Sequence, residues 1–446
     1  MTEKKLFPFQ EEIVKEIEKR KKLIVRASPG LGKTVIACEF IRRNPDKTVL
    51  ILTPPITPLV KSWIEHLFEW AKLKPNELQV ITKGGTLIDY YKRVILVPYT
   101  IFTKLYLMMD RRDILILDEN HLLKDPKRKR SRAVLQYSHF HRPEFIIMLT
   151  GTPIYNKPID LWTSLHLCNP VRFNSFWKFA IQYCGAYKNK WGYWEFPAHA
   201  SQRLRSLVKP YIVSKTWQEV KDQIPVPPLI KKEIPLGKAT KEIVELNKLI
   251  ERTEEGLKKE NLKKRQRQLV GIQKIPKVVE LLTDYLIHKH DRIVLFVWHR
   301  KVAETYREKL NGKGIKAEIF YGGLSGSEKM KLLDEFKKGE IQILIMNWLA
   351  GGLGLNMEFC HCGIFAELDY TTSAIQQAFY RIFRLTSKEP VFVYFTRLED
   401  SYEDRIVEIL LEKEDVQEKI LGKLDFKLPF EERESKSFGI KLNQAK

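Results

Sequence analysis

One short stretch near the start of the chain restricts the possible folds more than any other. A predicted strand ends with Ile24-Val25-Arg26 and leads into the loop ASPGLGKT (27–34), and a helical pattern follows at once over 35–41. A loop of this kind between a strand and a helix is a P-loop, although Ala27 stands where the motif usually begins with glycine. An ordinary glycine-rich turn is the alternative, and the flanking strand and helix disfavour it.

The residue types in this loop suit phosphate binding. Gly30 and Gly32 let backbone N–H groups approach phosphate oxygens, which bulky side chains would prevent. Lys33 reaches the β- and γ-phosphates, the Thr34 hydroxyl ligates Mg²⁺, and the helix N-terminus adds a favourable dipole. ATP and Mg²⁺ are therefore the predicted cofactors. The predicted nucleotide-binding residues of the loop are Ser28, Pro29, Gly30, Leu31, Gly32, Lys33 and Thr34.

Two adjacent acids follow a later apolar strand. Asp118 and Glu119 come directly after Ile114–Leu117. In open α/β sheets, ligands bind at the carboxyl ends of the strands. We expect Asp118 to hold Mg²⁺, and Glu119 to orient and deprotonate the attacking water. A solvated acidic turn is the alternative, and the P-loop upstream makes it the weaker one.

Short β-branched runs alternate with helical patterns in two separate regions. Nearly continuous apolar strands separated by helices indicate parallel sheets that are covered on both faces. We therefore predict an α/β fold with two domains of one type. The predicted strands are Lys22–Ala27, Thr48–Thr53, Arg93–Val97, Asp113–Leu117 and Phe145–Leu149, then Arg292–Trp298, Lys316–Phe320, Ile341–Met346, Gly363–Leu368 and Val391–Phe395.

The pattern changes between these two regions. Residues 160–222 are predicted to be helical around an aromatic segment, AYKNKWGYWEF (186–196), and prolines at 225, 227 and 228 predict a stiff extended stretch. From about Asp425 the chain lacks clear periodicity and is expected to fray. The predicted divisions are an ATP-binding domain at 1–159, a helical insertion with an aromatic hairpin at 160–222, a linker and charged helical insertion at 223–275, a second domain at 276–424 and a tail at 425–446.

Composition limits the partners. Lysine and arginine total 77 against 55 acids, and the net charge of +22 favours a polyanion, either nucleic acid or an anionic membrane. No membrane span is predicted, because no apolar run approaches about 18 residues. No signal peptide is predicted, because the N-terminal MTEKKLFPFQEE lacks an uninterrupted apolar stretch. The five cysteines form no C-x-x-C pair, so a reduced intracellular compartment without a structural metal is expected.

The order of the motifs resembles a superfamily-two helicase core with two RecA-like domains. The P-loop is followed by DENH (118–121), LTGTP (149–153), AGGLGLN (350–356) and QAFYRIFR (377–384). DENHLLKDPKRKRSRA and LTGTPIYNKPIDLWTSLHLCNP are similar to Snf-family patterns. YCGAYKNKWGYWEF, IVSKTWQEV and the proline segment resemble the fork-remodelling, annealing-helicase branch and phage branched-DNA helicases. The resemblance covers about residues 6–412.

The resemblance implies further nucleotide-site roles. Gln10 looks like the glutamine that reads adenine, and Gly354 of AGGLGLN looks like a nucleotide-binding residue. Thr150 and Thr152 would couple the nucleotide site to domain movement. Arg381 and Arg384 are spaced i, i+3, so one helix can point both at the cleft. The implied catalytic set is Lys33, Glu119, Gln377, Arg381 and Arg384.

The resemblance also implies a DNA track at strand ends, where small residues and backbone N–H groups contact phosphate without reading bases. Its members are Thr53, Pro54, Tyr99, Thr100, His299, Arg300 and Gly322. Lys190 and Trp191 of the aromatic segment are expected at a fork point, where exposed aromatics stack on unpaired bases. The alternative is that the aromatics form a small core, with Trp194 and Phe196 as its first members. The basic run 124–132 either binds phosphate or is a solvated helix start.

These features together predict a DNA-dependent ATPase, a translocase or helicase that remodels or unwinds branched DNA in replication, recombination or repair. The alternatives are an RNA helicase and a nucleic-acid-binding protein that uses ATP as a switch without unwinding. A monomer that acts on duplex or branched DNA is expected, with no membrane partner and with replication or recombination proteins as candidate partners. The expected location is the cytoplasm of a prokaryotic or phage-infected cell rather than a nucleus.

Overall fold

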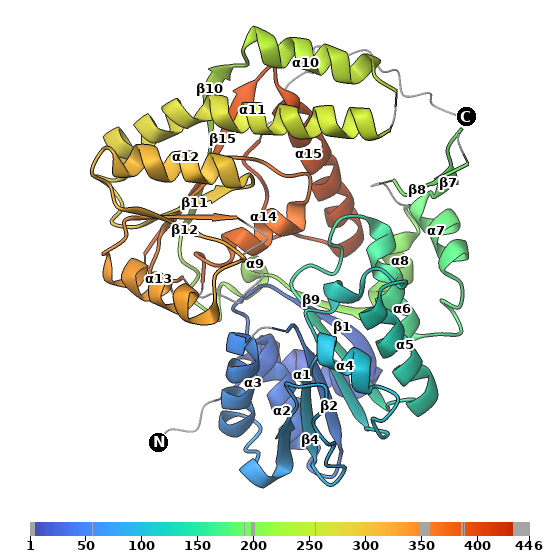
Figure 1. Cartoon of the computed structure of the whole chain (residues 1–446). Helices are drawn as coiled ribbons and strands as arrows, with labels where there is room; N and C mark the ends of the chain where they lie inside the picture. The colour runs from blue at the N-terminus through green and yellow to red at the C-terminus, as the bar shows by residue number, and fades with distance from the viewer. Residues whose placement is uncertain are drawn as a thin grey trace.

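Figure 1 shows two lobes, each built around a parallel β-sheet with helices packed on it. The computed structural model describes residues 5–55, 57–190, 192–197, 201–254, 256–347, 357–384, 387 and 389–430. The N-terminal sheet forms the lower lobe in Figure 1, and the C-terminal sheet forms the upper lobe. The predicted α/β fold with two parallel-sheet domains is therefore confirmed.

The N-terminal sheet runs in the order β3-β4-β2-β5-β6-β1-β9, and its strands pair in parallel. Val49 and Ile51 pack on one face of the sheet, and Leu50 and Leu52 pack on the other. Because both faces are buried, the strands are apolar throughout. The strands are β1 (Lys22–Ala27), β2 (Val49–Thr53), β3 (Leu78–Val80), β4 (Val94–Pro98), β5 (Ile114–Asp118), β6 (Phe145–Thr150) and β9 (Ile212–Lys215).

Helices cover this sheet and form the insertion beside it. The α-helices are α1 (Pro8–Arg20), α2 (Lys33–Arg43), α3 (Thr57–Glu69), α4 (Tyr99–Leu105), α5 (Lys129–His141), α6 (Trp162–Cys168), α7 (Phe176–Cys184), α8 (Leu204–Val208) and α9 (Trp217–Val220). Short 3₁₀ turns lie at Pro75–Glu77, Asn120–Leu123, Pro158–Leu161 and Lys209–Tyr211. In Figure 1, α9 lies where the two lobes meet.

The C-terminal sheet runs in the order β10-β15-β14-β11-β13-β12, again with parallel pairing. Its strands are β10 (Leu229–Lys238), β11 (Ile293–Val297), β12 (Ala317–Phe320), β13 (Ile343–Asn347), β14 (Cys362–Phe365) and β15 (Val391–Glu399). Its helices are α10 (Lys241–Arg252), α11 (Leu257–Leu281), α12 (Arg300–Asn311), α13 (Gly326–Lys338), α14 (Thr372–Phe379) and α15 (Tyr402–Leu421), with a π-turn at Leu282–Leu286.

All the predicted strands are found, with ends shifted by a few residues, and three further strands were not predicted. β3 has three residues, which leave little pattern to read. β9 lies inside the region predicted to be helical and pairs with β1, where Ile212 is opposite Ile24. β10 lies in the predicted linker and pairs with β15. β10 is an edge strand, and an edge strand tolerates charged residues and proline. These residues, among them Pro235, interrupt the apolar pattern by which a strand is recognised in a sequence.

The aromatic segment forms the predicted hairpin. β7 (Tyr187–Lys188) and β8 (Trp194–Glu195) pair antiparallel, with Tyr187 opposite Glu195. Gly192 has a φ of 79°, which favours glycine at this point of the turn. In Figure 1 the hairpin stands beside α7, at the edge of the molecule.

The expectation that the chain frays from Asp425 is wrong for the residues up to Phe430. Phe426, Leu428 and Phe430 are buried. The ring of Phe426 lies 4.5 Å from that of Phe379, and the ring of Phe430 lies 5.6 Å from that of Phe395. We call residues 422–430 the C-terminal strap. Its apolar side chains alternate with Lys427 and Pro429, a short period-two signal that was available in the sequence.

Candidate nucleotide site and nucleic-acid interface

The P-loop connects the end of β1 to the start of α2. Gly30 and Gly32 have φ values of 86° and 75°, so the loop needs glycine at both positions. Lys33 is the first residue of α2, and its Nζ donates to the carbonyl of Ala27, 2.9 Å away across the loop. Burial lowers the pKa of Lys33, while the charges of Glu119 and Asp118 oppose that shift. The lysine is thus held over the loop, close to two carboxylates.

Asp118 and Glu119 occupy the carboxyl end of β5. Burial raises the pKa of Asp118, and the charge of Glu119 adds to the effect. Trp63 Nε1 donates to Asp118 Oδ2 at 2.9 Å and fixes that carboxylate. A cation would relieve the cost of this buried charge, so Asp118 and the Thr34 hydroxyl in the first turn of α2 suit Mg²⁺.

Glu119 is held in the form that a general base requires. Its φ is 47°, an uncommon backbone conformation for a residue with a side chain. Burial pushes the pKa of Glu119 upward, but the hydrogen bond from His121 and the charges of Lys33 and Arg384 leave it below its usual value. An ionised carboxylate beside the P-loop lysine can accept a proton from water.

His121 is a functional residue that the sequence reasoning left without a role. Its Nδ1 lies 3.2 Å from Glu119 Oε2 and 3.3 Å from Thr150 Oγ1. On the other side of the ring, Gln377 Nε2 lies 3.2 Å from His121 Nε2. Thr150 Oγ1 in turn accepts from the backbone N–H of Thr152 at 3.0 Å. One imidazole therefore joins the acid pair, the end of β6 and the second lobe. In the sequence, the signal for a role of His121 was its position in the DENH motif (118–121).

Arg384 of the second lobe reaches the same site, and Arg381 lies close to Arg384. The expectation that one helix carries both Arg381 and Arg384 is wrong, because α14 ends at Phe379 and both arginines lie in the turn and loop that follow it. The charge of Arg384 acts on both Lys33 and Glu119. Burial, with the neighbouring charge of Arg384, lowers the pKa of Arg381 to about 9. Within the described part of the chain, Arg381 Nε and Nη1 and Arg384 Nε have no hydrogen-bond partner. Buried guanidinium nitrogens without a hydrogen-bond partner are costly, so an anion between the lobes fits this arrangement.

Gln10 lies against the P-loop. Its Nε2 donates to the carbonyl of Leu31 at 3.1 Å, and its Oε1 accepts from the backbone N–H of Phe7 at 3.0 Å. A Cβ added to Gly32 would lie 2.5 Å from Gln10 Nε2. In this structure Gln10 therefore supports the loop. Gly354, the other nucleotide-binding residue implied for a distant segment, lies outside the described residues.

A second contact to the P-loop comes from two residues that the sequence reasoning did not assign. Ser28 Oγ donates to Asp425 Oδ2, and the backbone N–H of Trp217 donates to Asp425 Oδ1 at 2.6 Å. Trp217 Nε1 donates to the carbonyl of Pro29 at 3.1 Å. The Trp217 ring lies 4.3 Å from the ring of Phe383, in the segment that bears the arginines. The strap and α9 thus connect the P-loop with the second lobe.

The predicted DNA residues fall into two groups. Thr53, Pro54 and Tyr99 are buried, and the Tyr99 hydroxyl donates to the carbonyl of Asp118 at 2.9 Å. Their side chains therefore support the site from within and do not lie on the surface. Thr100, Lys190, Arg300 and Gly322 are exposed, and His299 is half-buried. Trp191 lies outside the described residues.

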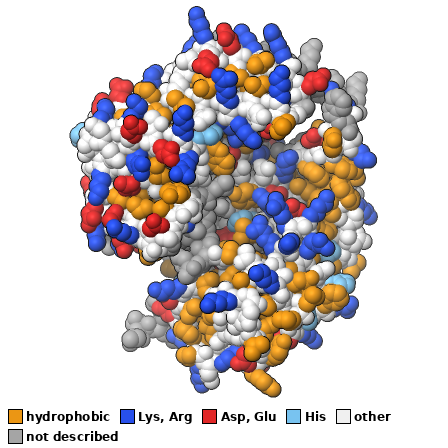
Figure 2. Space-filling view, viewed as in Figure 1, with side chains coloured by type: hydrophobic (Ala, Val, Ile, Leu, Met, Phe, Trp, Pro, Cys, Tyr) orange, Lys and Arg blue, Asp and Glu red, His pale blue; other side chains and the backbone are white. Residues whose placement is uncertain are grey.

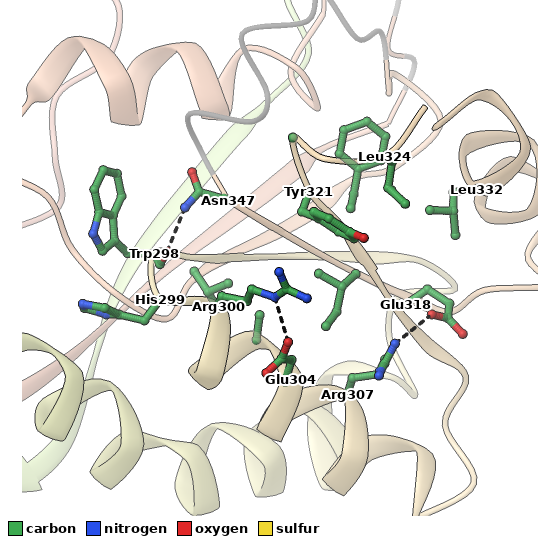
Figure 3. A pocket seen from close by; sticks show the side chains of 15 residues that line it. Trp298, His299, Arg300, Glu304, Arg307, Glu318, Tyr321, Leu324, Leu332 and Asn347 are labelled. Atoms are coloured by element: carbon green, nitrogen blue, oxygen red, sulfur yellow. Dashed lines mark hydrogen bonds and ion pairs between the residues drawn. The ribbon is translucent and has the colours of Figure 1, made fainter. Parts of the chain in front are cut away.

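His299, Arg300 and Gly322 are brought together, although they come from different segments. They line one pocket of about 640 Å³ at the carboxyl ends of β11, β12 and β13 (Figure 3). Glu367 orients His299, since its Oε1 lies 2.6 Å from the imidazole Nδ1. Three residues of the predicted DNA track therefore lie close together in the second lobe.

Basic side chains line the recess between the lobes. Figure 2 shows this recess, with Lys and Arg side chains along its rim. In the basic run, Lys127, Arg128 and Lys129 are exposed at the start of α5. Lys124 Nζ lies 3.6 Å from the centre of the Tyr155 ring, and Tyr155 also stacks on His121. The start of this run is therefore packed close to the DENH motif.

No group of three or more His, Cys, Asp and Glu side chains in the described ranges is arranged to hold a metal ion. No helix among these residues has the length and apolarity needed to cross a membrane.

Two family models match the chain. The model of the SNF2-related domain matches residues 13–280, which is more than half of the sequence. The chain belongs to the SNF2 family. The model of the helicase conserved C-terminal domain matches residues 273–386 of this SNF2-family chain. Its domain content is that of a helicase-type ATPase, and the predicted resemblance is confirmed.

Curated relatives are about a quarter identical to this SNF2-family chain over the aligned residues. The SWI/SNF-related matrix-associated actin-dependent regulator of chromatin subfamily A-like protein 1 of Xenopus laevis is 24% identical over 424 residues, which are 92% of this chain and 43% of the relative. The human DNA annealing helicase and endonuclease ZRANB3 is 24% identical over 414 residues, which are 88% of this chain and 38% of the relative. The chain thus spans about two fifths of the length of these relatives.

Solved structures include a similar chain. The Sulfolobus solfataricus SWI2/SNF2 ATPase core in complex with dsDNA is 19% identical to this SNF2-family chain. The match covers 95% of this chain and 94% of that one, with a TM-score of 0.45.

Proposed function

We propose that the chain is an ATP-dependent DNA translocase or helicase that remodels branched DNA such as forks and four-way junctions. The observation that carries this proposal is the position of Arg384 of the second lobe, whose charge acts on both Lys33 and Glu119 of the first. Among the described residues, guanidinium nitrogens of Arg384 and of the buried Arg381 beside it have no hydrogen-bond partner. A triphosphate between the lobes would satisfy them. The similarity to annealing helicases, together with the net charge of +22, supports DNA as the polymer that is moved.

The residues divide the work of hydrolysis between the two lobes. Lys33 and the P-loop backbone bind phosphate, while Asp118 and Thr34 would hold Mg²⁺, which supplies charge neutralisation when it is bound. Glu119 accepts a proton from the attacking water. Arg381 and Arg384 neutralise the charge that develops in the transition state, and they can do so only while the lobes are closed.

The hairpin is the element best suited to a branch point. Trp194 packs on Trp177 of α7 with ring centres 4.5 Å apart, and Lys188 Nζ lies 5.6 Å from the Trp194 ring centre. Tyr187 and Tyr193 are 55% and 72% exposed. Trp194 is therefore half-buried against α7, while the two tyrosines are free to stack on unpaired bases.

The experiment is ATP turnover measured with a fork, a four-way junction, plain duplex, single-stranded DNA and duplex RNA. We expect the highest turnover with branched DNA, and Glu119→Gln as the inactive control. Stimulation by RNA above DNA would favour an RNA helicase instead. Nucleic-acid binding without turnover would favour an ATP-controlled binding protein.

A pair of variants tests the hairpin in the same assay. Tyr193→Ala should retain turnover on plain duplex and lose processing of the fork. Trp194→Ala should lower thermal stability, because Trp194 packs on α7. If Tyr193→Ala processes forks as the wild type does, the hairpin does not act at the branch.

A further inference from the structure

The pocket in the second lobe has features that a contact to the phosphate backbone does not require. It lies between α12 and the segment that leads into α13, and its volume of about 640 Å³ falls within the range of about 300–1,000 Å³ for small-molecule sites. Its floor is apolar. The floor residues are Val297, Ala303, Ile319, Phe320, Leu324 and Leu332.

An aromatic ring and a cation face each other in this pocket. The Arg300 guanidinium lies 5.3 Å from the centre of the Tyr321 ring (Figure 3). Arg300 Nε donates to Glu304 Oε1 at 2.8 Å, which steers the guanidinium. Tyr321 is 38% exposed, so part of the ring remains available for a second partner. This ring–cation pair offers a stacking surface beside a positive charge.

The wall that carries Arg300 is fixed before any ligand arrives. Glu367 Oε2 accepts the backbone N–H groups of Trp298 at 2.6 Å and His299 at 3.0 Å. Asn347 Nδ2 donates to the carbonyl of Trp298 at 2.8 Å. A turn held from both sides loses little freedom on binding, which favours affinity.

The charges along the pocket decide what can enter it. Glu304 and Glu318 line it together with Arg300 and Arg307, so the interior carries no excess of positive charge for a phosphate. Glutamate carboxylates accept from the amino groups of adenine, cytosine and guanine. His299 and Arg300 lie at the edge shared with the predicted DNA track. A flat, apolar ring joined to a phosphate chain fits this distribution.

We propose that the pocket takes an unpaired nucleobase of the bound DNA strand, which stacks on Tyr321. The proposal rests on the proposed function in that it takes DNA as the polymer, and it adds a base-binding site to the backbone track. The base comes either from an unpaired arm of a branch or from a duplex in which it leaves the stack. Both sources present the same chemistry, and the substrates below distinguish them.

The test uses oligonucleotides with one 2-aminopurine, placed either in the single-stranded arm of a fork or within a duplex. Binding to the full chain should change the fluorescence of the probe in the arm. An abasic site at that position should weaken binding about tenfold, in line with the stacking energy of one base. A fluorescence change with the duplex probe as well would mean that the base leaves the stack.

Three variants test whether stacking on the Tyr321 ring is the interaction that binds the base. Tyr321→Ala should abolish both the fluorescence change and the abasic effect, whereas Tyr321→Phe should retain both, because it keeps the stacking face. Tyr285→Ala is the matched control, since Tyr285 is 50% exposed on the same lobe and has Lys289 Nζ 3.8 Å from its ring centre. Tyr285→Ala should behave as the wild type does.

The outcomes separate this proposal from the proposed function. If DNA stimulates wild-type ATP turnover while the abasic site and Tyr321→Ala leave affinity unchanged, the base pocket is disproved and the translocase stands. If the probe responds and Tyr321→Ala abolishes the response, but no DNA stimulates turnover, the pocket stands and the translocase fails. If Tyr321→Phe loses the response together with Tyr321→Ala, stacking is not the interaction, and the proposal falls.

Discussion

His121 contacts residues of three sequence motifs, which are DENH (118–121), LTGTP (149–153) and QAFYRIFR (377–384). Its ring meets Glu119 and Thr150 within the first lobe and Gln377 from the second. A movement of the lobes that pulls Gln377 away would change the hydrogen bonding of the imidazole, and with it the environment of the Glu119 carboxylate. A change in the distance between the lobes would therefore act through His121 on Glu119, the proposed general base.

A double-mutant cycle tests this connection. His121→Ala and Gln377→Ala should each lower DNA-stimulated kcat, and the double variant should lose little more than either one, because both remove the same link. The expected coupling is about 0.5–3 kcal/mol, the range for residues in contact. Additive losses would mean that the two side chains act independently. The KM for ATP should stay near the wild-type value, since neither side chain belongs to the P-loop.

At the scale of elements, the sequence was most informative where both faces of a strand are buried. β1, β2, β4, β5 and β6 are continuous apolar runs, and their positions could be predicted because burial on two faces demands such runs. β9, β10 and the strap were missed, because short or edge segments need only a few apolar residues. Their partners are distant in the sequence, as Ile24 is from Ile212.

The residues of the nucleotide site also divide into those that a local motif predicts and those that it does not. The P-loop and DENH are local motifs, so their residues could be read directly. The contacts of Asp425 and Trp217 with Ser28 and Pro29 join segments about 190 to 400 residues apart, and no local pattern announces them. The burial of Tyr99 likewise depends on the packing of α4, since the ring is equally suited to surface and core.

The strap gives a prediction that depends on pH. Burial raises the pKa of Asp425 to about 6 from a usual value of 3.8, and contacts with Trp217 and Arg26 oppose the shift. The folded chain therefore holds this proton more tightly than the unfolded chain. The contribution of Asp425 to the free energy of unfolding therefore falls as the pH rises from about 4 to 6, and this loss is complete above pH 6.

Asp425→Asn should remove this loss, because an amide does not ionise and can still bond to Ser28 and Trp217. Its thermal midpoint should exceed that of the wild type at pH 7.5, and the difference should vanish as the pH approaches 4. Asp425→Ala is the control, and it should be less stable than Asp425→Asn at every pH. A lower midpoint for Asp425→Asn at pH 7.5 would show that attraction to Arg26 outweighs burial.

The whole molecule carries a net charge of +22, with basic side chains around the recess between the lobes. Release of counterions from DNA should therefore dominate affinity. The logarithm of the binding constant should fall linearly with the logarithm of the salt concentration, with a slope of about −0.9 for each neutralised phosphate. Affinities for several unrelated duplexes, measured at increasing salt, should fall in parallel. A flat response to salt, or large differences between sequences, would contradict a backbone-tracking protein.

Arg384 tests whether the proposed hydrolysis requires both lobes. Its charge acts on Lys33 and Glu119, and its Nε has no hydrogen-bond partner among the described residues. Arg384→Ala should leave ATP binding nearly intact and lower kcat by about 10³-fold or more, the effect typical of an arginine that stabilises a phosphoryl transition state.

The matched control for this variant is Arg405→Ala. Arg405 is exposed on α15, where its Nη1 lies 2.7 Å from Glu408 Oε2. Removal of this surface cation should leave kcat within about twofold of the wild type, because an exposed ion pair contributes little. Single-turnover kinetics on plain duplex separates ATP binding from the chemical step. If Arg384→Ala turns over as fast as Arg405→Ala, the second lobe does not complete the ATP site, and hydrolysis depends on the first lobe alone.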